Sequence, residues 1–403
     1  MLARDAGFVL ASAFLGGVWE EQPMWARGRR VYGHAPRWLR RVVREVLAAY
    51  PRPPEDRPRE LAAYIELVLG DELLPHAVRF PFFSPRTVRA PWPVPRIDTT
   101  GELAERFELD AGQLAWLADV RGLKRHVADE RLRNYRYLLL PRPGGAPRVI
   151  ERPKLRLKEI QRRILREILV WIPAHAAAHG FVPGRSALTH AARHVGRPAV
   201  LRVDLEDFFA SVTAARVYGI FRTAGYPEAV AHALTGLCTN ACRLDVPTPL
   251  RRRLATPHLP QGAPTSPALA NLAAHALDRR LSGLGANYSR YADDLTFSGA
   301  HRIRGLLPAI AAIARDEGFR VNPRKTRLMS SGGRQTVTGI VVNARPNVPR
   351  RDYDRLKALL HNAARNGPGE LDRDHVLGRI AWVASLNPAR GDKLRATFAA
   401  IEW

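Results

Sequence analysis

The chain has 403 residues, 46% of them hydrophobic, so it can bury a real core and is not a disordered protein. Its 63 Lys and Arg against 38 Asp and Glu give a formal charge of +25, which favours nucleic acid as partner over a membrane surface or a merely arginine-rich proteome. No targeting or membrane-spanning stretch stands out, and Cys238 and Cys242 are expected to be buried thiols in a reducing cytoplasm.

The first 83 residues are predicted to be helical. The run "RWLRRVVREVLAAY" repeats apolar residues at helical spacing, with Trp38, Val42 and Val46 on one face. The run "SPRTVRAPWPVPRI" follows at 84–97 and holds four prolines, which favour an extended linker over a helix. We therefore expect a domain boundary at this linker.

A hairpin and a basic helix are predicted next. The run "YRYLLLPRPGGAPRVIERPK" indicates a strand, a Pro-Gly-rich turn and a second strand from Arg148. The following "KLRLKEIQRRILREILVWI" has one apolar helix face and another face with a basic residue every four positions. That basic face is either solvated or a phosphate-contacting stripe, and the pattern alone leaves both open.

Two adjacent carboxylates, Asp293 and Asp294, lie in the strand-like run "SRYADDLTFSG". Two like charges in a packed strand are costly unless a cation neutralises them. Because successive strand residues point to opposite faces, both acids can face one site only at a tight turn, such as a β-hairpin tip beside the strand that ends at Asp204. Three carboxylates would then suit Mg²⁺ and two-metal phosphoryl transfer. The alternative is an exposed turn with two solvated acids.

The motifs around these acids resemble those of reverse transcriptases. "YADD" resembles the Tyr-x-Asp-Asp signature, "VDLEDFFASV" the first palm motif, "LPQGAPTSPALANL" the motif that contacts template and nucleotide, and "NPRKT" the lysine motif. "QTVTGIVVN" contains a Val-Thr-Gly tripeptide similar to one found in bacterial retron enzymes. The whole pattern resembles a retron-type reverse transcriptase from about Leu103 to Pro388.

The resemblance implies roles for the acidic and lysine motifs. Asp204, Asp293 and Asp294 would be catalytic and would hold two Mg²⁺ ions, with Mn²⁺ as an alternative. Lys325 looks like the lysine that protonates departing pyrophosphate. Phe209 matches the family's steric gate, whose ring would collide with a ribose 2′-hydroxyl and so select dNTPs.

Further residues would contact substrates by the same resemblance. Gln261 and Gly262 would let the backbone and an amide approach the incoming nucleotide. Tyr291 would touch the primer end, and Arg142 and Arg148 on the predicted hairpin are candidates for the triphosphate. The alternative for both arginines is an ordinary exposed position.

The resemblance implies an α+β right-hand polymerase fold with fingers, a palm built on an antiparallel sheet, a helical thumb and a helical N-terminal extension. The expected parts are an extension over 1–83, a linker over 84–97, fingers and palm over 98–345 and a thumb over 346–403. The expected activity is RNA-directed DNA synthesis of retron type in the cytoplasm, copying a structured noncoding RNA into single-stranded DNA in antiphage defence.

The expected partners are that RNA as template and primer, the RNA–DNA hybrid, dNTPs and an effector protein, with no membrane. One alternative is another bacterial reverse transcriptase, of the abortive-infection or diversity-generating type. A second is a non-catalytic RNA-binding protein on a relic polymerase fold.

Overall fold

The computed structural model describes the backbone of residues 3–70, 72, 74–83, 91–127, 129–142, 145–241 and 254–403, and their side chains except at 3, 4, 124, 125, 142, 145 and 146. The fold is mixed α+β. It divides into two compact units: Met1–Ile172 with Thr213–Ser266, and Pro173–Val212 with Pro267–Trp403. None of the described helices combines the length and apolar composition needed to cross a bilayer.

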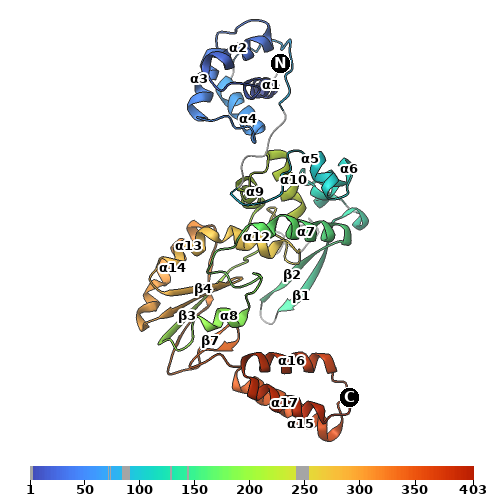
Figure 1. Cartoon of the computed structure of the whole chain (residues 1–403), viewed down its shortest axis with the longest axis vertical. Coiled ribbons are helices and arrows are strands. Elements are labelled where there is room, and N and C mark those ends of the chain that lie inside the picture. The colour runs from blue at the N-terminus through green and yellow to red at the C-terminus, as the bar shows by residue number, and fades with distance from the viewer. Residues whose placement is uncertain are drawn as a thin grey trace. The chain divides into compact units, whose positions relative to one another are not determined.

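The first unit begins with a helical bundle that shares one apolar core (Figure 1). Its helices are α1 (Ala3–Leu15), α2 (Glu21–Tyr32), α3 (Leu39–Ala49) and α4 (Pro58–Leu69). In α3 the buried residues Leu39, Val42 and Val46 recur every three to four positions, so one apolar stripe faces the core. The helices predicted within 1–83 are therefore present, whereas the domain boundary stays a prediction. The predicted linker at 84–97 lies partly outside the described residues.

The rest of the first unit consists of helices and a two-stranded hairpin. Its elements are α5 (Thr100–Arg106), α6 (Ala111–Ala118), η1 (Leu123–His126), η2 (Glu130–Leu132), β1 (Tyr135–Arg142), β2 (Gly145–Pro153), α7 (Leu155–Glu167), η3 (Leu169–Trp171), α9 (Ala214–Thr223) and α10 (Glu228–Cys238). The two strands pair antiparallel up to the partners Arg142 and Gly145, so the second strand begins earlier than the predicted start at Arg148. The apolar face of α7 is buried through Leu157, Ile160 and Ile164, as its spacing predicted.

The second unit is built on a four-stranded antiparallel sheet in the order β4-β5-β3-β6. The strands are β3 (Ala199–Leu205), β4 (Asn287–Tyr291), β5 (Asp294–Gly299) and β6 (Val321–Ser330), with a small hairpin of β7 (Thr336–Val337) and β8 (Ile340–Val341). The helices of this part are α8 (Ala187–Ala192), α12 (Ser266–Ala273), α13 (His275–Ser282), η4 (His301–Leu306) and α14 (Leu307–Asp316). Helices α8 and α13 both contact β4, the strand that leads to the Asp293–Asp294 pair.

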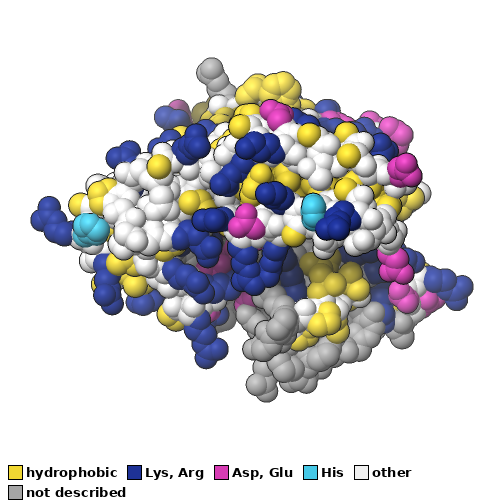
Figure 2. All heavy atoms as spheres, turned by 90° about the horizontal axis from the view of Figure 1, so that it is seen from below, with side chains coloured by type: hydrophobic (Ala, Val, Ile, Leu, Met, Phe, Trp, Pro, Cys, Tyr) yellow, Lys and Arg dark blue, Asp and Glu magenta, His cyan; other side chains and the backbone are white. Residues whose placement is uncertain are grey.

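The chain ends in three helices, α15 (Arg350–Asn366), α16 (Arg373–Leu386) and α17 (Pro388–Ala399), around a separate apolar core (Figure 1). All three lie within 346–403, the range predicted for the thumb. Helix α17 begins directly after α16, because the Asn387 side chain accepts a hydrogen bond from the backbone N–H of Arg390 and Pro388 occupies the first turn. Along α15 the basic residues stay exposed, namely Arg350, Arg351, Arg355, Lys357 and Arg365. Figure 2 shows one face of the molecule on which Lys and Arg side chains greatly outnumber acidic ones.

Candidate active site

The centre of the sheet brings two of the predicted aspartates together. Asp204 near the end of β3 and Asp294 at the start of β5 are directly opposite partners in an antiparallel pair. Asp293 lies in the turn between β4 and β5, and its carbonyl oxygen accepts a hydrogen bond of 2.9 Å from the backbone N–H of Leu205. The predicted hairpin tip beside the strand of Asp204 is therefore confirmed.

Two cations pair with these carboxylates. Lys325 on β6 donates from Nζ to both Asp204 oxygens, at 3.0 and 2.9 Å. Arg202 forms an ion pair with Asp294. Burial raises the pKa of Asp294, Arg202 opposes that rise, and the charges of Asp293 and Asp204 add to it. Arg202 was not among the predicted residues, although strand alternation places it on the same face of β3 as Asp204.

These residues fit a hard divalent cation, although the described part of the chain has no group of three or more His, Cys, Asp or Glu arranged to hold a metal. Magnesium is often held by one or two carboxylates together with substrate phosphates. Asp204 and Asp294 offer oxygen donors only, and the electrostatic effect of the acids on Asp294 is the kind that a cation relieves. Binding would require Lys325 and Arg202 to give up part of their contact with these acids. The three-carboxylate metal site stays a prediction.

A hollow of about 600 Å³ lies beside the two aspartates. Its walls carry more cations than acids: the charged lining residues are Arg202, Asp204, Asp294, Arg324, Lys325, Arg327 and Arg334. A polyanion would find favourable charge over most of this lining.

Three aromatic rings lie close together in the same unit. Phe181 is 6.2 Å from Phe209 and 6.4 Å from Tyr291 between ring centroids. Phe209 is half-buried, whereas Phe208 is buried and stacks on Phe319. Phe208 is therefore a core aromatic residue. Phe181 was not predicted, and its positive φ of 60° gave no sequence signal because the residue is not glycine.

Two buried histidines, His190 in α8 and His194 just after this helix, hydrogen-bond to the β4–β5 hairpin. His194 bonds through Nδ1 to the Ser298 hydroxyl and through Nε2 to the Ser289 hydroxyl, both at 2.7 Å. His190 bonds to Ser289 at 2.9 Å and to Thr296 at 3.2 Å. These bonds tie both strands of the hairpin that carries Asp293 and Asp294 to the α8 segment.

The predicted nucleotide loop, which contains Gln261 and Gly262, belongs to the first unit. The Gln261 carbonyl accepts a hydrogen bond of 2.8 Å from the backbone N–H of Glu151 on β2. Gly262 has a φ of 130°, and a Cβ added there would lie 2.9 Å from the Glu151 carbonyl oxygen. Only glycine satisfies both conditions without strain, so the Gln-Gly pair is explained by its docking on the hairpin.

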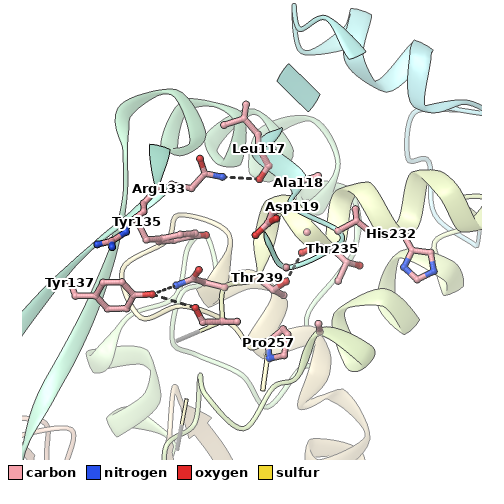
Figure 3. A pocket seen from close by; sticks show the side chains of 17 residues that line it. Leu117, Ala118, Asp119, Arg133, Tyr135, Tyr137, His232, Thr235, Thr239 and Pro257 are labelled. Atoms are coloured by element: carbon pink, nitrogen blue, oxygen red, sulfur yellow. Dashed lines mark hydrogen bonds between the residues drawn. The ribbon is translucent and has the colours of Figure 1, made fainter. Parts of the chain in front are cut away.

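A buried polar network supports that docking. Glu151 accepts from Asn240 at 2.8 Å and bonds to His258 at 2.9 Å, and Asn240 also donates to the Tyr137 hydroxyl at 3.0 Å. Burial lowers the pKa of His258, but the hydrogen bond and charge of Glu151 outweigh it, so the pKa is raised. Tyr137 and Asn240 also line a cavity of about 190 Å³, which contains none of the predicted site residues (Figure 3).

The two predicted arginines of the hairpin have different outcomes. Arg148 is exposed on β2, opposite Leu140. Arg142 ends β1, but its side chain lies outside the described residues. Of the two cysteines, Cys238 is buried as expected, and burial raises its pKa to about 12, while Cys242 lies outside the described residues.

The sequence around this site matches a known protein family. The model of the family "Reverse transcriptase (RNA-dependent DNA polymerase)" matches residues 140–357, which include all three aspartates and Lys325. The chain belongs to the reverse transcriptase family.

Two relatives place this reverse transcriptase within the retron type. The Retron Mx65 reverse transcriptase of Myxococcus xanthus is 44% identical over 285 residues, covering 67% of this chain and 65% of the relative. The Retron Mx162 reverse transcriptase of the same organism is 37% identical over 335 residues, covering 76% and 67% respectively. The chain thus spans about two thirds of the length of these relatives.

A solved foamy viral protease-reverse transcriptase in complex with double-stranded DNA is a more distant likeness. The two sequences are 14% identical, the match covers 90% of this chain and 55% of the viral chain, and the TM-score is 0.40.

Proposed function

We propose that this chain is an RNA-directed DNA polymerase of retron type. It copies part of a structured noncoding RNA into single-stranded DNA, the template and product that the resemblance implies. The observation that carries the proposal is the opposition of Asp204 and Asp294 across β3 and β5, with Asp293 in the adjoining turn. Family membership and the retron relatives support the same activity.

The aspartates are proposed to hold two magnesium ions together with the phosphates of the incoming nucleotide. Such ions lower the pKa of an attacking hydroxyl and stabilise charge on the reacting phosphate. Lys325 lies on Asp204 at hydrogen-bond distance, so it is close enough to provide a proton to a leaving group beside the acids. Arg202 neutralises Asp294 while no cation is bound.

Substrate selection is proposed to depend on Phe209. Its half-buried ring lies near those of Phe181 and Phe208, at 6.2 and 5.6 Å between centroids. These neighbours restrict the movement of the Phe209 ring, which would exclude a ribose 2′-hydroxyl by steric overlap. Gln261 and Gly262, fixed against β2, are proposed to contact the nucleotide, and Arg148 its triphosphate.

The template and product are proposed to contact the basic surfaces. A-form duplexes are recognised mainly through phosphates and 2′-hydroxyls, and the exposed arginines of α15 suit such contacts. The cation-rich hollow beside Asp204 offers the same chemistry near the acids. An effector protein and a role in antiphage defence complete the proposal, as the resemblance to retron enzymes implies.

The experiment is incorporation of labelled dNTP on a primed RNA template with Mg²⁺. We expect incorporation by the wild-type chain, its loss on chelation of the metal, and loss of at least a thousandfold in the double variant Asp293→Asn plus Asp294→Asn. Asp316→Asn, which changes an exposed acid paired with Arg280, is the matched control and should keep full activity. Unchanged incorporation by the double variant would refute the site, and an inactive wild type would favour the non-catalytic RNA-binding alternative.

The retron type is tested separately by sequencing the nucleic acid that co-purifies with the chain. We expect a single structured RNA and a DNA complementary to part of it. A variable repeat copied from a template repeat would instead indicate a diversity-generating enzyme.

A further inference from the structure

The turn that carries Asp293 has a conformation that its own sequence does not favour. Ala292, between Tyr291 and Asp293, has a φ of 54°. This left-handed region is disfavoured for residues with a Cβ, and glycine is the usual occupant. The turn must therefore be held by contacts from outside it.

Arg290 supplies the first of these contacts. Its Nη1 donates to the Ala292 carbonyl oxygen at 3.1 Å and to Asn271 Oδ1 at 2.9 Å. Its Nε and Nη2 donate to the two carboxylate oxygens of Asp278 at 2.8 and 2.6 Å. Both Arg290 and Asp278 have 0% exposure, so the guanidinium is fixed on one side by a buried ion pair and on the other by the turn.

Gly180, in the segment between η3 and α8, supplies the second contact. A Cβ added at Gly180 would lie only 2.7 Å from the Ala292 backbone nitrogen. The Gly180 carbonyl in turn accepts a hydrogen bond of 2.8 Å from Asn271, the same side chain that accepts from Arg290. Arg290, Asn271 and Gly180 thus enclose the Ala292 peptide.

The same guanidinium also contacts the ring next to the proposed gate residue Phe209. The Arg290 Cζ lies 5.6 Å from the centroid of the Phe208 ring, and Phe208 is the neighbour of Phe209 at 5.6 Å between centroids. One buried side chain therefore contacts both the turn before Asp293 and the ring beside Phe209.

We propose that Arg290 is a positioning residue that, with Gly180, fixes the Ala292 turn so that Asp293 and Asp294 are placed to bind divalent metal. The inference rests on the proposed function for the identity of the bound group. Arg290 acts through backbone and not through contact with substrate. A planar fork is needed, because one ammonium cannot donate to Asp278, Asn271 and the Ala292 carbonyl in these directions at once.

A purely structural role for the ion pair is the competing explanation. Buried ion pairs often stabilise a fold without serving a site, and removing one partner leaves an unpaired charge. The two roles differ in what they change. A structural role lowers the melting temperature and the folded fraction, whereas a positioning role changes the metal affinity of molecules that remain folded.

The experiment compares three variants of the full chain. Arg290→Lys keeps the charge opposite Asp278 but loses the fork, and Gly180→Ala disturbs the turn while leaving the ion pair in place. Arg280→Lys is the matched control, because Arg280 lies on α13 and pairs with Asp316 and Glu317 at 2.8 and 2.9 Å, away from the turn. Each variant is measured for melting temperature, for Mn²⁺ affinity by electron paramagnetic resonance without nucleotide, and for kcat, dNTP KM and half-saturating Mg²⁺.

We expect Arg290→Lys and Gly180→Ala to weaken Mn²⁺ binding and raise half-saturating Mg²⁺ at least fivefold. Their kcat should fall at least tenfold, with dNTP KM changed less than twofold, and Arg280→Lys should match the wild type. Wild-type Mn²⁺ affinity in folded Gly180→Ala would overturn the proposal, as would a loss of kcat equal to the loss of folded protein. An inactive wild type would contradict the proposed function instead, while the Mn²⁺ titration would still test Arg290.

Discussion

Acidification to about pH 5 should destabilise the folded chain through His190 and His194. Both are fully buried and hydrogen-bonded to serine or threonine hydroxyls of the β4–β5 hairpin. Burial, with a smaller contribution from neighbouring charges, lowers the pKa of His190 to about 2 and that of His194 to about 3. In the unfolded chain both return to the ordinary value of 6.5.

The sign follows from which state binds more protons. Between about pH 6.5 and the lowered values, the unfolded chain is protonated at both histidines and the folded chain is not. The contribution of these two histidines to the free energy of unfolding is therefore fully present above their ordinary pKa and is lost as the pH falls below it. Each histidine contributes about 1.4 kcal/mol per pH unit in that window, or about 2 kcal/mol at pH 5, so the pair contributes about 4 kcal/mol.

The assay is urea denaturation at a series of pH values between 8 and 5, on the wild type and His194→Gln. Glutamine can still bond to the serine hydroxyls but does not titrate, so the variant should lose about 2 kcal/mol less than the wild type over this range. His361→Gln, at an exposed position on α15, is the control and should reproduce the wild-type slope. Parallel pH dependences for the wild type and His194→Gln would show that His194 does not stay neutral in the fold, and the reasoning would fail.

Three other changes test separate parts of the molecule. Phe209→Ala should admit ribonucleotides, and an unchanged dNTP/rNTP ratio would contradict the steric gate. Gly262→Ala should raise the dNTP KM about tenfold, equivalent to about 1.4 kcal/mol, because its Cβ would meet Glu151; Gly332→Ala, with open space around it, is the control. Glu228→Gln should lower the unfolding free energy by about 1 kcal/mol in urea denaturation, because the Glu228 carboxylate accepts from two backbone N–H groups at the start of α4; an unchanged midpoint would contradict this capping role.

Local patterns were enough to predict several elements and the β4–β5 hairpin that carries Asp293 and Asp294. The apolar spacing of α3 and α7 predicted their buried faces, because a helix repeats every 3.6 residues regardless of what it packs against. The pair Asp293–Asp294 predicted a hairpin tip beside Asp204, because the side chains of two adjacent residues in a regular strand point to opposite faces. These inferences depend on neighbours in sequence.

Only the tertiary structure decided which distant residues support the site. The hydrogen bonds of Lys325 to Asp204, of Arg202 to Asp294 and of His194 to Ser298 join residues that are 121, 92 and 104 positions apart in the sequence. No periodicity encodes such pairs, because an arginine in a strand reads the same whether it meets solvent or a buried carboxylate. Burial and strand register decide which partner each side chain meets. The tertiary structure therefore fixes the positions of the residues that the motif supplies.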